Sequence, residues 1–173
     1  MKKLIFILLI SIVAFPSCKE SAKKNDEVIT TYYLIRHAEK DRSDASNKNP
    51  ELTEQGLKRA ENWAKYFEDV QFDAIYSTDY NRTKQTATPT AKANKLELQY
   101  YNPFTLVIEE FIEKTKGETV LIVGHSNTTP QFVNKILQNT KYEDIADDNN
   151  ANLYKVTISK NGTTSALSKV DIN

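Results

Sequence analysis

The chain has 173 residues, of which 10% are aromatic, and this length and composition are typical of a single globular domain with a hydrophobic core. Its 23 Lys and Arg side chains are balanced by 23 Asp and Glu side chains, so the formal net charge is zero. Because binding to nucleic-acid phosphates requires clustered basic side chains, and the chain has no basic stripe, we expect no nucleic-acid partner.

The N-terminal 17 residues have the pattern of a bacterial signal peptide. Two lysines precede the apolar run Leu4–Phe15, which is shorter than the roughly 20 residues with which a helix crosses a bilayer. The only cysteine, Cys18, follows, and the segment resembles a lipoprotein signal in which this cysteine becomes the lipidated first residue. The alternative is a secreted protein with an unpaired thiol. We therefore expect three parts: a signal peptide (1–17), a flexible tether (18–29) and a folded domain (30–173).

This reading predicts the location of the protein and excludes one kind of cross-link. A lipid on Cys18 would attach the domain to a membrane of the bacterial cell envelope, on the periplasmic face or the outer surface. A disulfide bond within the chain is excluded because there is no second cysteine.

From residue 30 onward, short apolar runs alternate with helical patterns, which predicts an α/β domain. Strands are expected over 31–35, 72–77, 96–100 and 119–123. After the last of these, the dipeptide Asn161-Gly162 lies between two further strand-like segments and predicts a β-hairpin at the C-terminal end.

Helices are expected between and after these strands. The first covers about 54–68, with Thr53 as its N-cap, and its expected buried face consists of Leu57, Ala60, Ala64 and Phe67. The others are expected from about residue 79, where Pro89 should kink or end the helix, from Asn102-Pro103 to Gly117, and from about residue 129.

The candidate functional residues lie at strand ends. Arg36 and His37 follow the first strand, His125 follows the fourth, and the loop after the second strand leads to Arg82. Open α/β sheets bind ligands beyond the carboxyl ends of their strands, so we expect these four side chains to meet at one edge. Each residue alone is more typical of a structural or solvated position, but the group of four suits a phosphate dianion.

Arginine and histidine at such an edge favour phosphoryl chemistry. Arginine presents a planar fork of donors that matches phosphate oxygens and keeps its charge. A neutral imidazole can attack phosphorus with one ring nitrogen while the other donates a hydrogen bond that fixes the tautomer. Pre-aimed donors stabilise the charge that develops in the transition state.

Four stretches, "LIRHAEK", "LTEQGLKRA", "RTKQTA" and "VGHSN", resemble the histidine phosphatase superfamily, which is also called phosphoglycerate mutase-like. The resemblance implies a three-layer α/β/α sandwich with a mostly parallel central sheet. It also implies that His37 is transiently phosphorylated, that Arg36 and Arg82 bind the phosphate, and that His125 completes the pocket and stabilises the transferring group. It implies no metal and no other cofactor.

The family's general acid has no clear match. Asn102 stands at a loop position where a carboxylate is expected. Our choice is Glu109, with Glu39 beside the nucleophile as the competitor. Glu109 could equally well be a solvent-exposed residue on the surface of a helix, without a catalytic role. The small phosphohistidine phosphatases of the superfamily lack a well-defined acid.

These patterns predict an enzyme that hydrolyses phosphomonoesters outside the cytoplasm. Hydrolysis is favoured over mutase activity because no stretch is long enough for a lid domain. The alternatives are a mutase, a phosphate-binding or interaction module without turnover, and a hydrolase with a metal held by His37, Glu39 and His125. The expected partner is a small phosphorylated substrate or a phosphoprotein, and the sequence does not define the physiological substrate or the oligomeric state.

Overall fold

The structure is a computed structural model that describes residues 27–172. The predicted signal peptide, Cys18 and most of the predicted tether lie outside these residues. The described part contains the following elements in chain order: β1 (Thr30–Arg36), α1 (Glu54–Tyr66), β2 (Ala74–Ser77), α2 (Asn81–Asn94), β3 (Leu98–Tyr100), α3 (Ile108–Lys114), β4 (Thr119–Gly124), α4 (Thr128–Leu137), β5 (Asn152–Ser159) and β6 (Gly162–Lys169).

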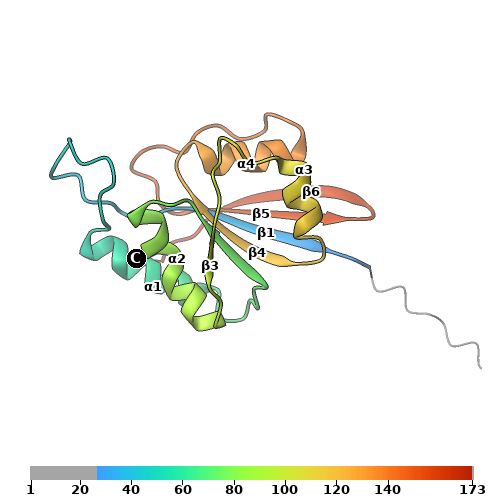
Figure 1. The fold of residues 1–173 in the computed structure, drawn as a ribbon, viewed down its shortest axis with the longest axis horizontal. Coiled ribbons are helices and arrows are strands. Elements are labelled where there is room, and N and C mark those ends of the chain that lie inside the picture. Colours follow the sequence, from blue (N-terminus) through green and yellow to red (C-terminus); the bar gives the residue numbers. More distant parts are fainter. Residues whose placement is uncertain (1–26, 173) are drawn as a thin grey trace, which may run out of the picture.

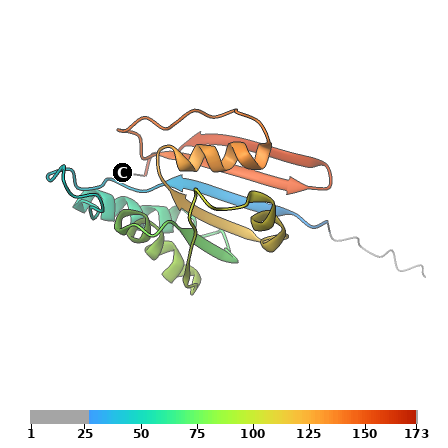
Figure 2. The same cartoon turned by 45° about the horizontal axis from the view of Figure 1, so that its top comes forward.

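The strands form one six-stranded sheet in the order β3-β2-β4-β1-β5-β6. The first four strands of this order run parallel to one another, whereas β5 is antiparallel to β1 and β6 is antiparallel to β5. Helices α3 and α4 cover one face of the sheet and α1 and α2 cover the other (Figures 1 and 2). The predicted fold class, a three-layer α/β/α sandwich with a C-terminal hairpin, is confirmed.

Each face of the sheet has its own hydrophobic core. Because side chains alternate along a strand, Leu34 of β1 packs with Phe132 of α4 on one face, while the next residue, Ile35, packs with Trp63 of α1 on the other. These two cores fix the sheet from both sides, and the carboxyl ends of its parallel strands are thereby held in a defined arrangement.

Helix α1 begins as the sequence predicts. The Thr53 side chain caps it by accepting a hydrogen bond from the Gly56 N–H. Gly56 lies against the backbone of Glu39, where a Cβ atom would come within 3.0 Å of the Glu39 carbonyl carbon. The buried stripe therefore starts at Gly56, and Leu57, which the sequence placed in the core, is rotated away from it and is 47% exposed.

Two other helix expectations differ from the structure. Of the two outcomes expected at Pro89, a kink or an end, the end is wrong, because α2 continues to Asn94 with buried residues on both sides of the proline. Helix α3 starts at Ile108 and not after Asn102-Pro103, since the Asn102 side chain accepts a hydrogen bond from the Phe104 N–H and forms a turn.

The hairpin of β5 and β6 confirms the signal from Asn161-Gly162. The turn residues are Lys160 and Asn161, and Gly162 follows at a φ of 114°, a conformation that favours glycine. Within residues 27–172, no helix combines the length and the apolar character needed to cross a membrane.

Candidate active site

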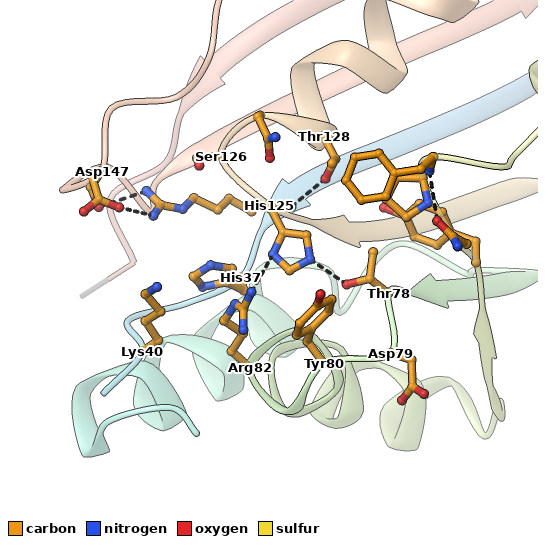
Figure 3. Close-up of a pocket in the computed structure, with 16 residues that line it drawn as sticks. His37, Lys40, Thr78, Asp79, Tyr80, Arg82, His125, Ser126, Thr128 and Asp147 are labelled. Carbon is orange, nitrogen blue, oxygen red and sulfur yellow. Dashed lines mark hydrogen bonds and ion pairs between the residues drawn. The ribbon is translucent and has the colours of Figure 1, made fainter. Parts of the chain in front are cut away.

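The topology brings the predicted residues to one edge of the sheet. Strands β1 and β4 are parallel neighbours in which Arg36 pairs with Gly124, and the His37 N–H donates to the Gly124 carbonyl at 3.0 Å. The residues that follow the two strands, His37 and His125, therefore lie side by side, with ring centroids 5.6 Å apart. Strand β2 adjoins β4 and contributes Thr78 at the same edge (Figure 3).

Gly124 permits the side chains of Thr129 and Tyr101 to pack closely against the end of β4. A Cβ atom there would lie 2.7 Å from the Thr129 hydroxyl and 2.9 Å from the Tyr101 hydroxyl. Because contacts below 3.0 Å force neighbouring atoms to move, a side chain at this position would require the Thr129 and Tyr101 side chains to move. The glycine therefore has a packing role directly before His125.

His37 is buried, with 4% of its surface exposed, and it is held by its backbone and by one ring nitrogen. Its Nδ1 lies 2.7 Å from the Ala38 carbonyl, and because a carbonyl only accepts, Nδ1 must carry the proton. The Asn150 side chain donates to the His37 carbonyl at 2.7 Å. This arrangement leaves the lone pair on Nε2, the ring nitrogen that can attack an electrophile.

Burial also keeps the His37 ring neutral. Desolvation lowers its pKa to about 3, and the charges of Arg36, His125 and Arg82 contribute to the lowering. At neutral pH the Nε2 lone pair is therefore available and not protonated.

His125 has the opposite tautomer, which a chain of hydroxyl groups fixes. Arg82 Nη2 lies 3.4 Å from Nδ1 and can only donate, so Nδ1 accepts and Nε2 carries the proton. Nε2–H donates to the Thr78 hydroxyl at 2.9 Å, and that hydroxyl lies 3.0 Å from the Thr83 hydroxyl. Thr83 donates in turn to the backbone carbonyls of Thr78 and Tyr80. Burial, followed by the charge of Arg82, lowers the pKa of His125 to about 4.

Arg82 has donors without partners. It lies in the first turn of α2, with its guanidinium carbon 4.4 Å from the centre of the Tyr80 ring. Its Nε and Nη1 atoms are buried and make no hydrogen bond within residues 27–172. Burial lowers its pKa from the usual value, but arginine keeps its charge. A partly buried cation with free donors is a site prepared for an anion.

Arg36 reaches the same cavity but is largely engaged by the protein. Its side chain is 2% exposed, and its Nη1 donates to the carbonyls of Ala146, Asp147 and Asn149 at 2.9–3.0 Å. Its Nη2 donates to the Asp147 carboxylate at 2.9 Å. Only Nε has no partner within the described part of the chain. Arg36 therefore positions the segment 146–149, and its Nε remains available to a ligand.

These side chains surround a cavity of about 470 Å³. Lys40 adds a third cationic side chain to its wall besides Arg36 and Arg82, and burial together with the nearby Arg42 lowers the pKa of Lys40. The N-terminus of α4, at Thr128, also lies at the cavity, where the helix dipole favours a negative charge. The cavity is therefore suited to a phosphate group.

The two carboxylates considered as general acids lie elsewhere. Glu109 is exposed on α3 and does not line the cavity. Glu39 accepts two hydrogen bonds from Arg59 Nε, at 2.8 and 3.0 Å, and this ion pair holds it against α1. The carboxylates that do line the cavity are Asp79 and Asp147, neither of which the sequence predicted.

The sequence analysis also missed Thr78, Lys40 and Tyr80. Thr78 is the first residue after β2, so the rule that selected Arg36-His37 and His125 at strand ends could have selected it as well. Among the described residues, no group of three or more His, Cys, Asp or Glu side chains is arranged to hold a metal ion.

The fold is phosphoglycerate mutase-like, and two histidines lie at one edge of its sheet. Residues 32–105 match the model of the Histidine phosphatase superfamily (branch 1), a segment that includes His37 and Arg82 but ends before His125. The matched segment is less than half of the chain, so it shows a similarity to this superfamily over those residues. No curated protein matched the sequence.

Solved structures share the fold over nearly their whole length. A phosphoserine phosphatase variant from Entamoeba histolytica, solved with phosphoserine, has a TM-score of 0.63 and 15% identity, covering 83% of this chain and 98% of its own. A phosphoglycerate mutase from Bacillus anthracis has a TM-score of 0.62 and 17% identity, covering 84% and 94%. A mycobacterial glucosyl-3-phosphoglycerate phosphatase has a TM-score of 0.60 and 12% identity, covering 84% and 100%. At these identities the likeness establishes the fold.

Proposed function

We propose that this domain hydrolyses phosphomonoesters through a phosphohistidine intermediate on His37. The observation that carries the proposal is the neutral, buried imidazole of His37, whose unprotonated Nε2 belongs to the same cavity as the unpartnered donors of Arg82. The family match supports it, because it covers both residues.

In the first step, His37 Nε2 attacks phosphorus. A nitrogen–phosphorus bond forms, the bond between phosphorus and the ester oxygen breaks, and its electron pair leaves with that oxygen. The proton on Nδ1 stays in place, where the Ala38 carbonyl stabilises the positive charge that the ring acquires. Arg82 donates to the phosphoryl oxygens as charge develops on them.

In the second step, water attacks the phosphohistidine. The water oxygen bonds to phosphorus, the nitrogen–phosphorus bond breaks, and its electron pair returns to Nε2. Dihydrogen phosphate leaves, and His37 is neutral again, so the ring is ready for another cycle. His125 belongs beside the transferring group, since Thr78 and Arg82 fix its ring next to His37.

Hydrolysis is a better proposal than mutase activity because the rim of the cavity is exposed. Phe104, Asp79 and Asp147 line the cavity and remain solvent-accessible. Water can therefore reach a phosphohistidine, whereas a mutase must protect this intermediate between its partial reactions. The similar structures include phosphatases and a mutase, so the fold alone favours neither.

Phosphate release by the purified protein from a panel of phosphomonoesters tests the proposal. We expect release that is unaffected by EDTA and inhibited by vanadate, which mimics the five-coordinate transition state. Loss of release in EDTA with recovery in zinc would establish a metal-dependent hydrolase instead. Binding of inorganic phosphate without release from any compound would favour the phosphate-binding module.

We also infer from the N-terminal pattern that a lipid on Cys18 anchors the protein to a membrane of the cell envelope. A single acyl chain binds membranes only reversibly, so a lipoprotein-type modification with more than one chain should give stable attachment. Cells expressing the full-length protein should retain it in the membrane fraction, and Cys18→Ser should move it to the soluble fraction. Equal partitioning of the two forms would reject the anchor.

A further inference from the structure

The cavity has an apolar side that the binding of phosphate does not require. Tyr101, Pro103 and Phe104 line it in one segment that follows β3. Phe104 is 80% exposed, the largest exposed fraction among the described large apolar side chains that are recorded as exposed. A ring left in solvent at the mouth of a cationic cavity has no role in the packing of the folded domain.

The segment that carries Phe104 is held in place. The Asn102 side chain accepts from the Phe104 N–H at 3.0 Å, and the Asn102 carbonyl accepts from the N–H of Leu106 at 3.0 Å. Tyr101 is buried and packs edge to face on Phe132 of α4, with ring centroids 5.7 Å apart. Pro103 further restricts the backbone. The ring of Phe104 is therefore presented by an ordered turn.

A second observation concerns the leaving group. The two carboxylates that line the cavity are both ion-paired, Asp79 with Lys84 at 2.9 Å and Asp147 with Arg36 and Arg42 at 2.9 and 2.8 Å. Hydrogen bonds from the arginines lower the pKa of Asp147. Among the described residues, the cavity thus presents no carboxyl group free of an ion pair that could protonate a strongly basic alkoxide.

We propose that the substrates of this site are aryl phosphates, in which a planar aromatic ring is attached to the ester oxygen. The proposal rests on the proposed function. The ring would pack on Phe104 while the phosphate meets Arg82, and attack by His37 would break the phosphorus–oxygen bond with the electron pair leaving as a phenolate. Phenolate, whose conjugate acid has a pKa of about 10, leaves without a proton far more readily than an alkoxide does.

Three probes separate the two parts of this proposal. Phenyl phosphate has a ring and a good leaving group, cyclohexyl phosphate has a saturated ring of the same carbon number and a poor leaving group, and acetyl phosphate has a good leaving group without a ring. We expect kcat/KM for phenyl phosphate to exceed that for cyclohexyl phosphate by at least about 10²-fold, the lower end of what a general acid contributes. Values within tenfold of each other would overturn the proposal.

The role of Phe104 is tested by substitution. Phe104→Ala should raise KM for phenyl phosphate about 2- to 10-fold, in line with the usual strength of an aromatic pair, while KM for acetyl phosphate should not show this rise. Phe104→Trp should restore the affinity. The matched control is Tyr100→Ala, because Tyr100 is 58% exposed at the end of β3, directly before this segment, but does not line the cavity. An equal effect of both alanine substitutions, or none for Phe104→Ala, would contradict the aromatic contact.

The remaining outcomes are distinguishable. No phosphate release from any of the three probes would defeat the proposed function, whereas release without preference for phenyl phosphate would defeat only this inference. If Lys40→Met slows the hydrolysis of cyclohexyl phosphate and leaves that of phenyl phosphate unchanged, Lys40 supplies a proton to the leaving group. The claim that the site lacks a general acid would then be wrong. A peptide with phosphotyrosine distinguishes the source of the aryl group. If the peptide is hydrolysed as fast as phenyl phosphate, the substrates are phosphorylated proteins. If only phenyl phosphate is hydrolysed, the substrates are small molecules.

Discussion

Replacement of His37 by alanine is expected to lower kcat by about four to six orders of magnitude, the scale of the loss when a covalent nucleophile is removed. The reason is that the substitution removes the atom that bonds to phosphorus, and no other described side chain occupies its position against the Ala38 carbonyl. Phosphate release from phenyl phosphate, followed with enough enzyme to detect very slow turnover, measures the effect.

The matched variant is His37→Asn, whose side-chain amide can still donate to the Ala38 carbonyl while it lacks a nucleophilic nitrogen. It should be as inactive as His37→Ala and should keep the fold. A denaturing quench of the unaltered protein during turnover should trap an acid-labile, alkali-stable phosphoryl group on His37. Near-normal activity of His37→Asn, or a trapped group on another residue, would mean that the nucleophile is a different side chain.

The pH dependence of kcat/KM gives an independent check on His37. Its pKa of about 3 means that the imidazole stays neutral between pH 5 and 8, so protonation of His37 in the free enzyme cannot reduce activity in this range. Activity should instead fall as the pH drops through the second pKa of the substrate phosphate, about 6, where the dianion takes up a proton. Substrates whose phosphates differ in pKa should lose activity at correspondingly different pH values on the acid side. A loss at the same pH for all of them would mean that a group of the enzyme is being protonated.

Replacement of Arg82 by methionine is expected to lower kcat/KM by about 10²- to 10³-fold, the usual cost of removing a pre-aimed donor. Two of its nitrogens are buried without partners, so they are free to bind phosphoryl oxygens. The same feature predicts that the thermal stability of the ligand-free protein stays constant or rises, since an apolar side chain replaces a guanidinium whose donors are unsatisfied. Kinetics and thermal unfolding of the same preparation measure both effects.

The control for Arg82 is Lys92→Met, which removes one positive charge from an exposed position on the same helix. It should leave kcat/KM within about twofold, because an exposed charge remote from the cavity is screened by salt. Equal losses in the two variants would show that net charge, and not the position of Arg82, determines the activity. A large drop in the melting temperature of Arg82→Met would show a structural role.

The sequence predicted the layers of this fold because each layer has a local signal. The apolar runs of β1 and β4 are short and lie between helical patterns, and the Thr53 cap and the Asn161-Gly162 turn mark boundaries within a few residues. The two histidines could be placed at the same edge because both follow strands, and parallel strands end at the same edge of a sheet.

The helix errors have a common cause. Asn102-Pro103 is typical of the start of a helix, and proline within a helix is typical of a kink or an end. The sequence predictions at residues 102–103 and at Pro89 followed these local preferences. In the structure the Asn102 side chain forms a turn, and packing of the buried residues around Pro89 outweighs the single backbone hydrogen bond that proline removes. Preferences of this kind are weak compared with the burial of a helix face.

The sequence by itself determined which residues are chemically suited to phosphoryl transfer and which edge of the sheet carries them, because residue type and order along strands are local properties. Only the tertiary structure decided how each is used. Arg36 is engaged by carbonyls more than 100 positions away, Thr78 fixes the tautomer of His125, and Glu39 is turned to Arg59. Such contacts join segments distant in the chain, so their geometry follows from packing of the whole domain, and no motif contains it.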